Sequence, residues 1–339
     1  MKRIALWLAV IASMLASTVA APAQDRRPIK IGYQTGEINV LLLYAINAKL
    51  FEKEGLDVQL SQFPAGPAML PALAANEADI AWMGEFPAVT GYSNGLPIEI
   101  LFMERLDLTN VRLSANPAAG IEKVADLKGK RIGVAIGSTS HYHTLQALSQ
   151  NGLKPEDVRL VNLTPANMPP AYAAGQIDAA FVWEPNIGAI ERAGARPIAT
   201  TKSLGMITGG VWVARKAFAA QSPDTVQRFL KAWDQAQKDY KADPANVRQY
   251  EAKRVDLPAA QFAKLIEGQS ASNPGFEQIL TADFMGPPGK EMDSRLMKHL
   301  HGIAAFLVAE KRIQAPPSNW PDIFNTKPIQ AYLAKRTTQ

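Results

Sequence analysis

The sequence predicts an α/β protein of two lobes, each a mixed, mostly parallel sheet flanked by helices. Short apolar segments alternate with segments of helical periodicity from residue 28 to residue 84, in the order strand, helix, strand, helix, strand. This order implies a parallel sheet with right-handed crossovers. The same alternation starts again at residue 123. The 339 residues are enough for two lobes of ordinary size.

The first unit is expected to contain strands at 28–35, 56–64 and 78–84, with helices at 41–55 and 65–77 between them. Gly55 is placed to end the first of these helices. The second unit is expected to contain a strand ending at Gly137, a helix that ends before Gly152, and further strands and helices between residues 157 and 201. The segment 211–218 returns to the first lobe, and the chain beyond Ser222 is mainly helical.

Composition indicates a globular protein with a substantial core, since hydrophobic residues make up 47% and charged residues 20% of the chain. Lys128, Lys130 and Arg131 are the densest basic group, and no aromatic residue lies among them. Nucleic-acid binding therefore has no support, and a solvated loop explains the group better. The chain has no cysteine, so disulfides are excluded.

The N-terminus has the features of a secretory signal peptide. Lys2 and Arg3 precede the apolar run IALWLAVIASML, and small residues follow as far as Ala23. A retained membrane anchor is the alternative, but the run is too short to span a bilayer. Cleavage near Ala23 would remove two positive charges and reduce the net charge from +5 to +3. A lipoprotein is excluded without cysteine, so an exported and unanchored protein is expected in the periplasm.

Ligands of open α/β sheets bind outside the carboxyl ends of the strands. In this chain those ends fall near Gln34, Gly84, Ser138 and Trp183, and most of them lead into a helix N-terminus. Free N–H groups at such a terminus bind anions. The stretch GSTSHY, residues 137–142, adds three hydroxyl groups at one of these points. Serine and threonine are also common N-caps, so a purely structural role stays open.

The nucleotide-binding motifs G-x-G-x-x-G and G-x-x-x-x-G-K-[ST] are absent, and the stretch GSTSH does not form a G-x-S-x-G elbow. The four histidines form two pairs, His141/His143 and His299/His301, both in predicted helices. Residues two apart do not share a helix face, so no metal site is expected. We expect no cofactor and no enzymatic activity.

Several segments together resemble a known family. KVADLKGKRIGVAIGSTSHYHTLQAL, IDAAFVWEP and GGVWVARKAF are similar to segments of the periplasmic solute-binding proteins of ABC importers for taurine, aliphatic sulfonates and nitrate, and most similar to the taurine-binding branch. IKIGYQT and GLPIEILF also match, so the resemblance covers nearly all of the mature chain. It implies a type II periplasmic binding protein fold with the ligand in the cleft between the lobes. By position, it places at the cleft Gln34, Gly84, Glu85, Phe86, Ser138, Thr139, His141 and Trp183.

The chain departs from that branch at three positions. Gly210 stands where the taurine branch has an aspartate that pairs with the ligand's ammonium group. Glu85 replaces a serine, and Glu184 replaces a small residue. Buried carboxylates need a positive partner. For Glu85 that partner is a structural arginine, Arg105 or Arg112, or the ligand itself.

For Glu184 a helix N-terminus already favours an acid, which makes a structural role the better interpretation. Trp183 and Phe86 either line the cleft or belong to the core, and Trp183 could face a cation.

We therefore expect a monomeric binding protein that closes on a small ligand by hinge motion. It would deliver this ligand to an inner-membrane permease with a cytoplasmic ATPase. Residues 24–113 and 213–339 would form lobe 1, and residues 114–212 lobe 2. The resemblance favours taurine or a related alkanesulfonate. The carboxylates favour a cationic or zwitterionic nitrogen compound such as an amine or guanidinium. An enzyme of pyrimidine or cofactor synthesis is the alternative of a different class, disfavoured by the signal peptide and by the absence of the cysteine motif of such relatives.

Overall fold

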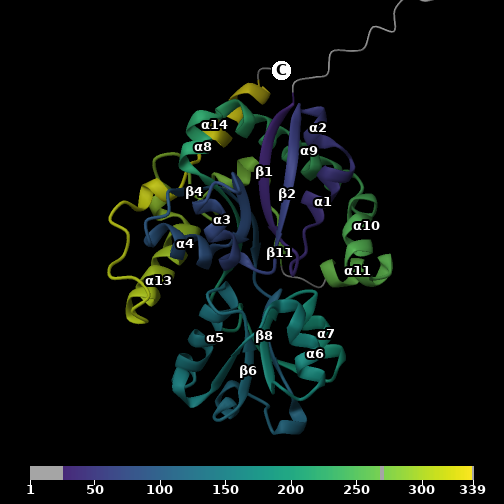
Figure 1. The fold of residues 1–339 in the computed structure, drawn as a ribbon, viewed down its shortest axis with the longest axis vertical. Helices are drawn as coiled ribbons and strands as arrows, with labels where there is room; N and C mark the ends of the chain where they lie inside the picture. Colours follow the sequence, from purple (N-terminus) through teal and green to yellow (C-terminus); the bar gives the residue numbers. More distant parts are fainter. Residues whose placement is uncertain (1–25, 268–270, 338–339) are drawn as a thin grey trace, which may run out of the picture.

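The protein has two lobes stacked along its long axis, each with its own sheet and core (Figure 1). The computed structural model describes residues 26–267 and 271–337. The predicted signal peptide, residues 1–23, lies outside the described residues. The predicted two-lobed α/β fold is confirmed.

Lobe 1 contains a sheet whose strands lie in the order β11-β4-β10-β3-β1-β2 within the described residues. The strands β1, β2 and β3 pair in parallel, whereas β10 runs antiparallel to both β3 and β4. Every residue of β3 from Ile80 to Met83 is buried, as expected for a central strand covered on both faces. The strands span Arg27–Gln34 (β1), Leu56–Phe63 (β2), Ile80–Gly84 (β3), Ile98–Asp107 (β4), Thr208–Arg215 (β10) and Ala271–Ser272 (β11).

Lobe 2 contains a sheet in the order β7-β6-β8-β5-β9. The central strand β8 is buried throughout and pairs in parallel with β6 and antiparallel with β5. The strands span Val111–Ala115 (β5), Arg131–Val134 (β6), Arg159–Asn162 (β7), Ala179–Trp183 (β8) and Arg196–Thr200 (β9).

The chain crosses between the lobes twice, from β4 to β5 and from β9 to β10. The predicted boundaries at 113/114 and 212/213 fall inside β5 and β10, so sheet membership places both crossings earlier, at about residues 108–110 and 201–207. The sequence pattern predicts neither β4 nor β5 as an element. Both strands pair antiparallel with partners that are distant in sequence, and a local pattern does not carry that information.

Helices cover the sheets of both lobes (Figure 1). The predicted helix at 41–55 is divided in two, because Lys49 adopts a left-handed backbone conformation with φ of 57°. The helices up to residue 192 span Val40–Asn47 (α1), Leu50–Lys53 (α2), Met69–Ala74 (α3), Glu85–Ser93 (α4), Thr139–Gln150 (α5), Met168–Ala173 (α6) and Asn186–Arg192 (α7).

The C-terminal helices return to lobe 1, as predicted for residues beyond Ser222. One of them, α13, packs on α4 and carries Phe306, which contacts the cores of both lobes. In the described part of the chain, no helix is both long and apolar enough to cross a bilayer. These helices span Lys216–Gln221 (α8), Pro223–Ala242 (α9), Pro244–Arg254 (α10), Ala259–Glu267 (α11), Phe276–Ile279 (α12), Arg295–Ala309 (α13) and Lys327–Thr337 (α14).

Candidate functional site

A pocket lies between the lobes, where strand ends of both sheets meet the first turns of α4 and α5. The cavity between the lobes has a volume of about 30 Å³. Six of the residues predicted for the site line this pocket, namely Gln34, Gly84, Ser138, Thr139, Trp183 and Gly210. Four others, Glu85, Phe86, His141 and Glu184, do not line it.

The beginning of α5 forms one wall of the pocket. Its first backbone N–H groups have no partner within the helix, which makes this terminus suited to an anion. The side chain of Ser138 does not cap the helix; it donates to the carbonyl of Ala135 at 2.7 Å instead. The hydroxyl of Thr139 is buried and has no hydrogen-bond partner in the described part of the protein. A polar ligand atom in the pocket would satisfy it.

Gly84 and Thr139 bring the two lobes into contact beside this wall. Gly84 is the N-cap of α4 in lobe 1, and a Cβ atom at this position would overlap the Thr139 hydroxyl of lobe 2. The turn therefore requires a glycine for the lobes to close, and the first turns of α4 and α5 then share one pocket.

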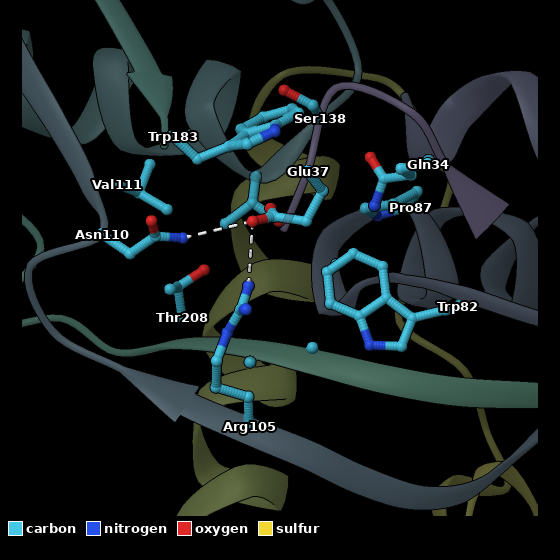
Figure 2. Close-up of a pocket in the computed structure, with 15 residues that line it drawn as sticks. Gln34, Glu37, Trp82, Pro87, Arg105, Asn110, Val111, Ser138, Trp183 and Thr208 are labelled. Atoms are coloured by element: carbon cyan, nitrogen blue, oxygen red, sulfur yellow. Dashed lines mark hydrogen bonds and ion pairs between the residues drawn. The ribbon is translucent and has the colours of Figure 1, made fainter. Parts of the chain in front are cut away.

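Charged side chains lie on another side of the pocket, around Arg105. This lining residue was not predicted for the site. Its guanidinium lies 3.1 Å from Oε1 of Glu37 and 3.8 Å from Oδ2 of Asp107. Figure 2 shows the side chains of Arg105 and Asn110 both directed at the Glu37 carboxylate. Burial raises the pKa of Glu37 to about 7, against the opposing effect of Arg105. Burial likewise raises the pKa of neighbouring Glu104 to about 7.

Of these carboxyl groups, Glu37 lines the pocket. Glu104 instead accepts a hydrogen bond from Nε1 of Trp212 at 2.7 Å, and Asp107 accepts the N–H groups of Thr109 and Asn110. Glu37 was missed because it follows the end of the predicted strand at Thr35 by two residues, in a loop without a motif. The signal that could have identified it is an acid directly after the first strand, in the same kind of position as the residues that were predicted.

Trp82 forms an apolar wall next to Gly210. The Arg105 guanidinium carbon lies 5.4 Å from the centroid of the Trp82 ring, which is a cation–π distance. A Cβ atom at Gly210 would lie 2.5 Å from Cζ2 of Trp82. The indole therefore occupies the space that any side chain at position 210 would need. The Trp82 Nε1 is buried without a hydrogen-bond partner among the described residues.

Glu85 is fully buried behind the pocket rather than in it. Its Oε2 accepts the backbone N–H of Gly209 at 2.9 Å, and its Oε1 lies 3.1 Å from Nε2 of His299. In the described structure it makes no hydrogen bond or ion pair with Arg105 or Arg112. The expected partner of Glu85 was a structural arginine or the ligand, but the partner in the structure is His299 of α13. No local pattern near residue 85 could indicate this histidine.

Glu184 has a structural partner, as one of the alternatives held. Its Oε1 lies 2.6 Å from the guanidinium of Arg112, which also binds Glu191, and its Oε2 accepts the N–H of Gly188 at 3.2 Å. The ion pair and the first turn of α7 hold this carboxylate inside lobe 2.

Phe86 and His141 also lie outside the pocket. The Phe86 ring stacks on Tyr142 with 5.5 Å between centroids, and it belongs to the core. His141 is 2% exposed, and burial lowers its pKa to about 4, so it is neutral at ordinary pH. Among the described residues, no group of three or more histidine or acidic side chains is arranged to hold a metal ion.

The sequence matches the family model "NMT1/THI5 like" over residues 39–247. It is 32% identical to the "Taurine-binding periplasmic protein" of Escherichia coli over 280 residues, which cover 77% of this chain and 85% of that protein. The chain belongs to this family, among its periplasmic binding proteins.

Other members of the family give the same assignment. The "Putative aliphatic sulfonates-binding protein" of Escherichia coli is 30% identical over 76% of this chain and 81% of its own length. The solved structure of the periplasmic aliphatic sulphonate binding protein SsuA from Escherichia coli is 26% identical, with a TM-score of 0.65, and the match covers 88% of this chain and 96% of that one.

Structures of lower identity show the fold alone. The alkanesulfonate-binding protein SsuA from Xanthomonas axonopodis pv. citri bound to MOPS has a TM-score of 0.70 at 24% identity, over 88% of this chain and 98% of that one. The desulfurization enzyme DSZB has a TM-score of 0.65 at 17% identity, over 92% of this chain and all of that one. The family fold is therefore shared by binding proteins and by an enzyme.

Proposed function

We propose that this protein is the periplasmic solute-binding component of an ABC importer and that its ligand is a small sulfonate which also carries an ammonium group, such as taurine. The observation that supports this most directly is the division of the pocket into two ends of opposite character. One end has helix N-termini and the Thr139 hydroxyl, which has no partner among the described residues, and the other has the buried carboxyl group of Glu37 beside Arg105.

The anionic end of the ligand would bind at Ser138 and Thr139. The first N–H groups of α5 and the Thr139 hydroxyl can donate to sulfonate oxygens without a positive side chain. The first turn of α4 follows Gly84 on the other side of the same space. Arg105 is less suited to this role, because Glu37 and Asp107 already surround it.

The ammonium end would bind at Glu37. A buried carboxyl group with a pKa of about 7 is only partly ionised at neutral pH, and a cation beside it favours the ionised form. The indole face of Trp82 lies in the same pocket and suits a cationic or methylene group. This assignment gives the ligand's ammonium group a carboxylate partner, although Gly210 stands where the taurine branch has an aspartate.

A cationic nitrogen compound, an amine or guanidinium, is the second candidate. It is favoured by the buried carboxyl group of Glu37 in the pocket, whose pKa burial raises to about 7. A compound of this kind would use the acidic end of the pocket and leave the α5 terminus to water.

Binding without turnover is the preferred interpretation. The relatives at 30–32% identity are named as binding proteins, and the chain contains no cysteine to act as a nucleophile. Location in the periplasm, after removal of the signal peptide near Ala23, is supported by the names of these relatives. Delivery to a membrane permease is supported by a relative of 27% identity named as a "Putative ABC transporter periplasmic binding protein" from Brachyspira hyodysenteriae. We expect the binding protein to act as a monomer.

Thermal unfolding and calorimetry with matched ligands test the proposal. The ligands to compare are taurine, ethanesulfonate, ethylamine, guanidine and nitrate. Their comparison separates the contribution of the α5 terminus from that of Glu37. At 100 times its Kd, a ligand adds about 2.7 kcal/mol to the free energy of unfolding. We expect taurine to bind most tightly and ethanesulfonate more weakly, because ethanesulfonate has no ammonium group to contact Glu37. Stabilisation by ethylamine and guanidine but not by either sulfonate would contradict the proposal. Loss of taurine over time, followed by NMR, would indicate an enzyme.

A further inference from the structure

The backbone carbonyl of Gly36 accepts two hydrogen bonds from the opposite lobe. Gly36 lies in the loop after β1 in lobe 1, and it is buried. Nε1 of Trp183, at the end of β8, donates to this oxygen at 2.7 Å. Nδ2 of Asn186, at the start of α7, donates to the same oxygen at 3.0 Å. Both lone pairs of one lobe-1 carbonyl are thus used by side chains of lobe 2.

A side chain at Gly36 would crowd the opposite lobe. A Cβ atom at Gly36 would lie 3.1 Å from Cβ of Pro165, which belongs to lobe 2. The next residue, Glu37, lines the pocket, and its Oε1 is 3.5 Å from Nδ2 of Asn110 in the segment that crosses between the lobes. Two consecutive residues of one loop therefore carry the contact with lobe 2 and a carboxylate of the pocket.

We infer that Trp183 and Asn186 are positioning residues that set ligand affinity by holding the cleft closed through the Gly36 carbonyl. Trp183 has two separate functions in this arrangement. Its ring lines the pocket, while its N–H is directed at Gly36 and is not free for a ligand. Asn186 does not line the pocket, so it acts only through the carbonyl.

The kinetic consequence follows from when these hydrogen bonds exist. They join the two lobes, so they form only after closure and must break before the ligand leaves. Their loss should therefore accelerate dissociation and leave association with the open form unchanged. A hydrogen bond contributes about 0.5–1.5 kcal/mol net, which corresponds to about a 2- to 12-fold change in a rate or equilibrium constant.

Stopped-flow kinetics with taurine as the probe test this inference on the mature protein. Trp183→Phe keeps an aromatic wall and removes the donor, and Asn186→Ala removes the second donor. Each is expected to raise the dissociation rate of taurine about 2- to 12-fold, and the double variant by more than either single one. The association rate should stay within about twofold. Trp320→Phe in lobe 1 and Asn151→Ala, whose amide bonds only within α5, are matched controls. An unchanged dissociation rate in the double variant would overturn the inference.

The use of taurine rests on the proposed function, so a second measurement is independent of any ligand. The chain has no cysteine, so Gln59→Cys in lobe 1 and Ala166→Cys in lobe 2, both at exposed positions, can carry a pair of spin labels. Without ligand, the double variant Trp183→Phe/Asn186→Ala should shift the distance distribution toward a more open form. An unchanged distribution would overturn the role of Gly36 as a closing contact, even if taurine binds. A shifted distribution in a protein that fails to bind taurine would support this role and reject only the proposed ligand.

Discussion

The carboxylate of Glu85 and the imidazole of His299 are in contact, with 3.1 Å between Oε1 and Nε2. The other carboxylate oxygen accepts the N–H of Gly209, a lining residue of the pocket. One side chain in the first turn of α4 therefore connects α13 to the beginning of β10, where the chain returns from lobe 2. The acid at this turn holds the wall of the pocket from behind.

Substitution of Glu85 should affect stability more than ligand binding. Glu85→Ala leaves the Gly209 N–H and His299 without a buried partner and should lower the free energy of unfolding by about 2–4 kcal/mol. Glu85→Gln keeps an acceptor for Gly209 and should cost less. Urea unfolding measures both changes. Taurine affinity in Glu85→Gln should stay within about twofold. A large loss of affinity without a loss of stability would instead place the carboxylate against the ligand.

Substitution of Thr139 should affect binding more than stability. Thr139→Val removes a buried hydroxyl that has no partner among the described residues, so the free energy of unfolding without ligand should not fall. The Kd for taurine, measured by calorimetry, should rise about tenfold if this hydroxyl donates to the sulfonate. Thr144→Val is the control on the same helix, since the Thr144 hydroxyl donates to the carbonyl of Ser140 and not to the pocket. An equal effect of both substitutions would show that α5 has simply been disturbed.

The free energy of unfolding should depend on pH through Glu37 and Glu104. Burial raises the pKa of both from the ordinary 4.5 to about 7. Between these values the folded state binds more protons than the unfolded state, so stability decreases as pH rises from about 4.5 to about 7 and then levels off. Glu37→Gln should reduce this decrease and leave the part due to Glu104. Urea unfolding at pH 5, 6, 7 and 8 without ligand measures the effect.

Taurine should release protons when it binds near pH 7, because its ammonium group favours ionised Glu37. Calorimetry in buffers of different ionisation enthalpy detects this release, and Glu37→Gln should abolish it. An identical pH profile in the variant and the original protein would remove Glu37 from both effects.

A side chain at position 84 should prevent full closure. Gly84→Ala introduces a Cβ atom that overlaps the Thr139 hydroxyl. The backbone angles of Gly84, φ −67° and ψ 159°, suit alanine, so the lobes themselves should fold normally. We expect the Kd for taurine to rise more than tenfold while the ligand-free melting temperature changes little. Small-angle X-ray scattering with saturating taurine should give a larger radius of gyration for Gly84→Ala than for the original protein. Tight binding by this variant would show that the lobes need not meet here.

Local sequence was enough to predict the two α/β units, the approximate ends of the strands and the helix starts that face the cleft. Hydrophobic periodicity and glycine positions are local, so they can be recognised without the fold. Gln34, Gly84, Ser138, Thr139 and Trp183 were predicted for the site for this reason, and all of them line the pocket.

The charged groups that contact one another could not be predicted from local sequence. Glu85 contacts His299, which is distant in sequence, and Arg105 of β4 pairs with Glu37 in the loop after β1. The crossings between the lobes and the Gly36 contact likewise join segments that are far apart along the chain. A carboxylate that becomes buried needs a partner, and the packing of strands and helices around it determines which residue that partner is. The free energy of burying a charge depends on that packing and not on the neighbouring residues of the chain.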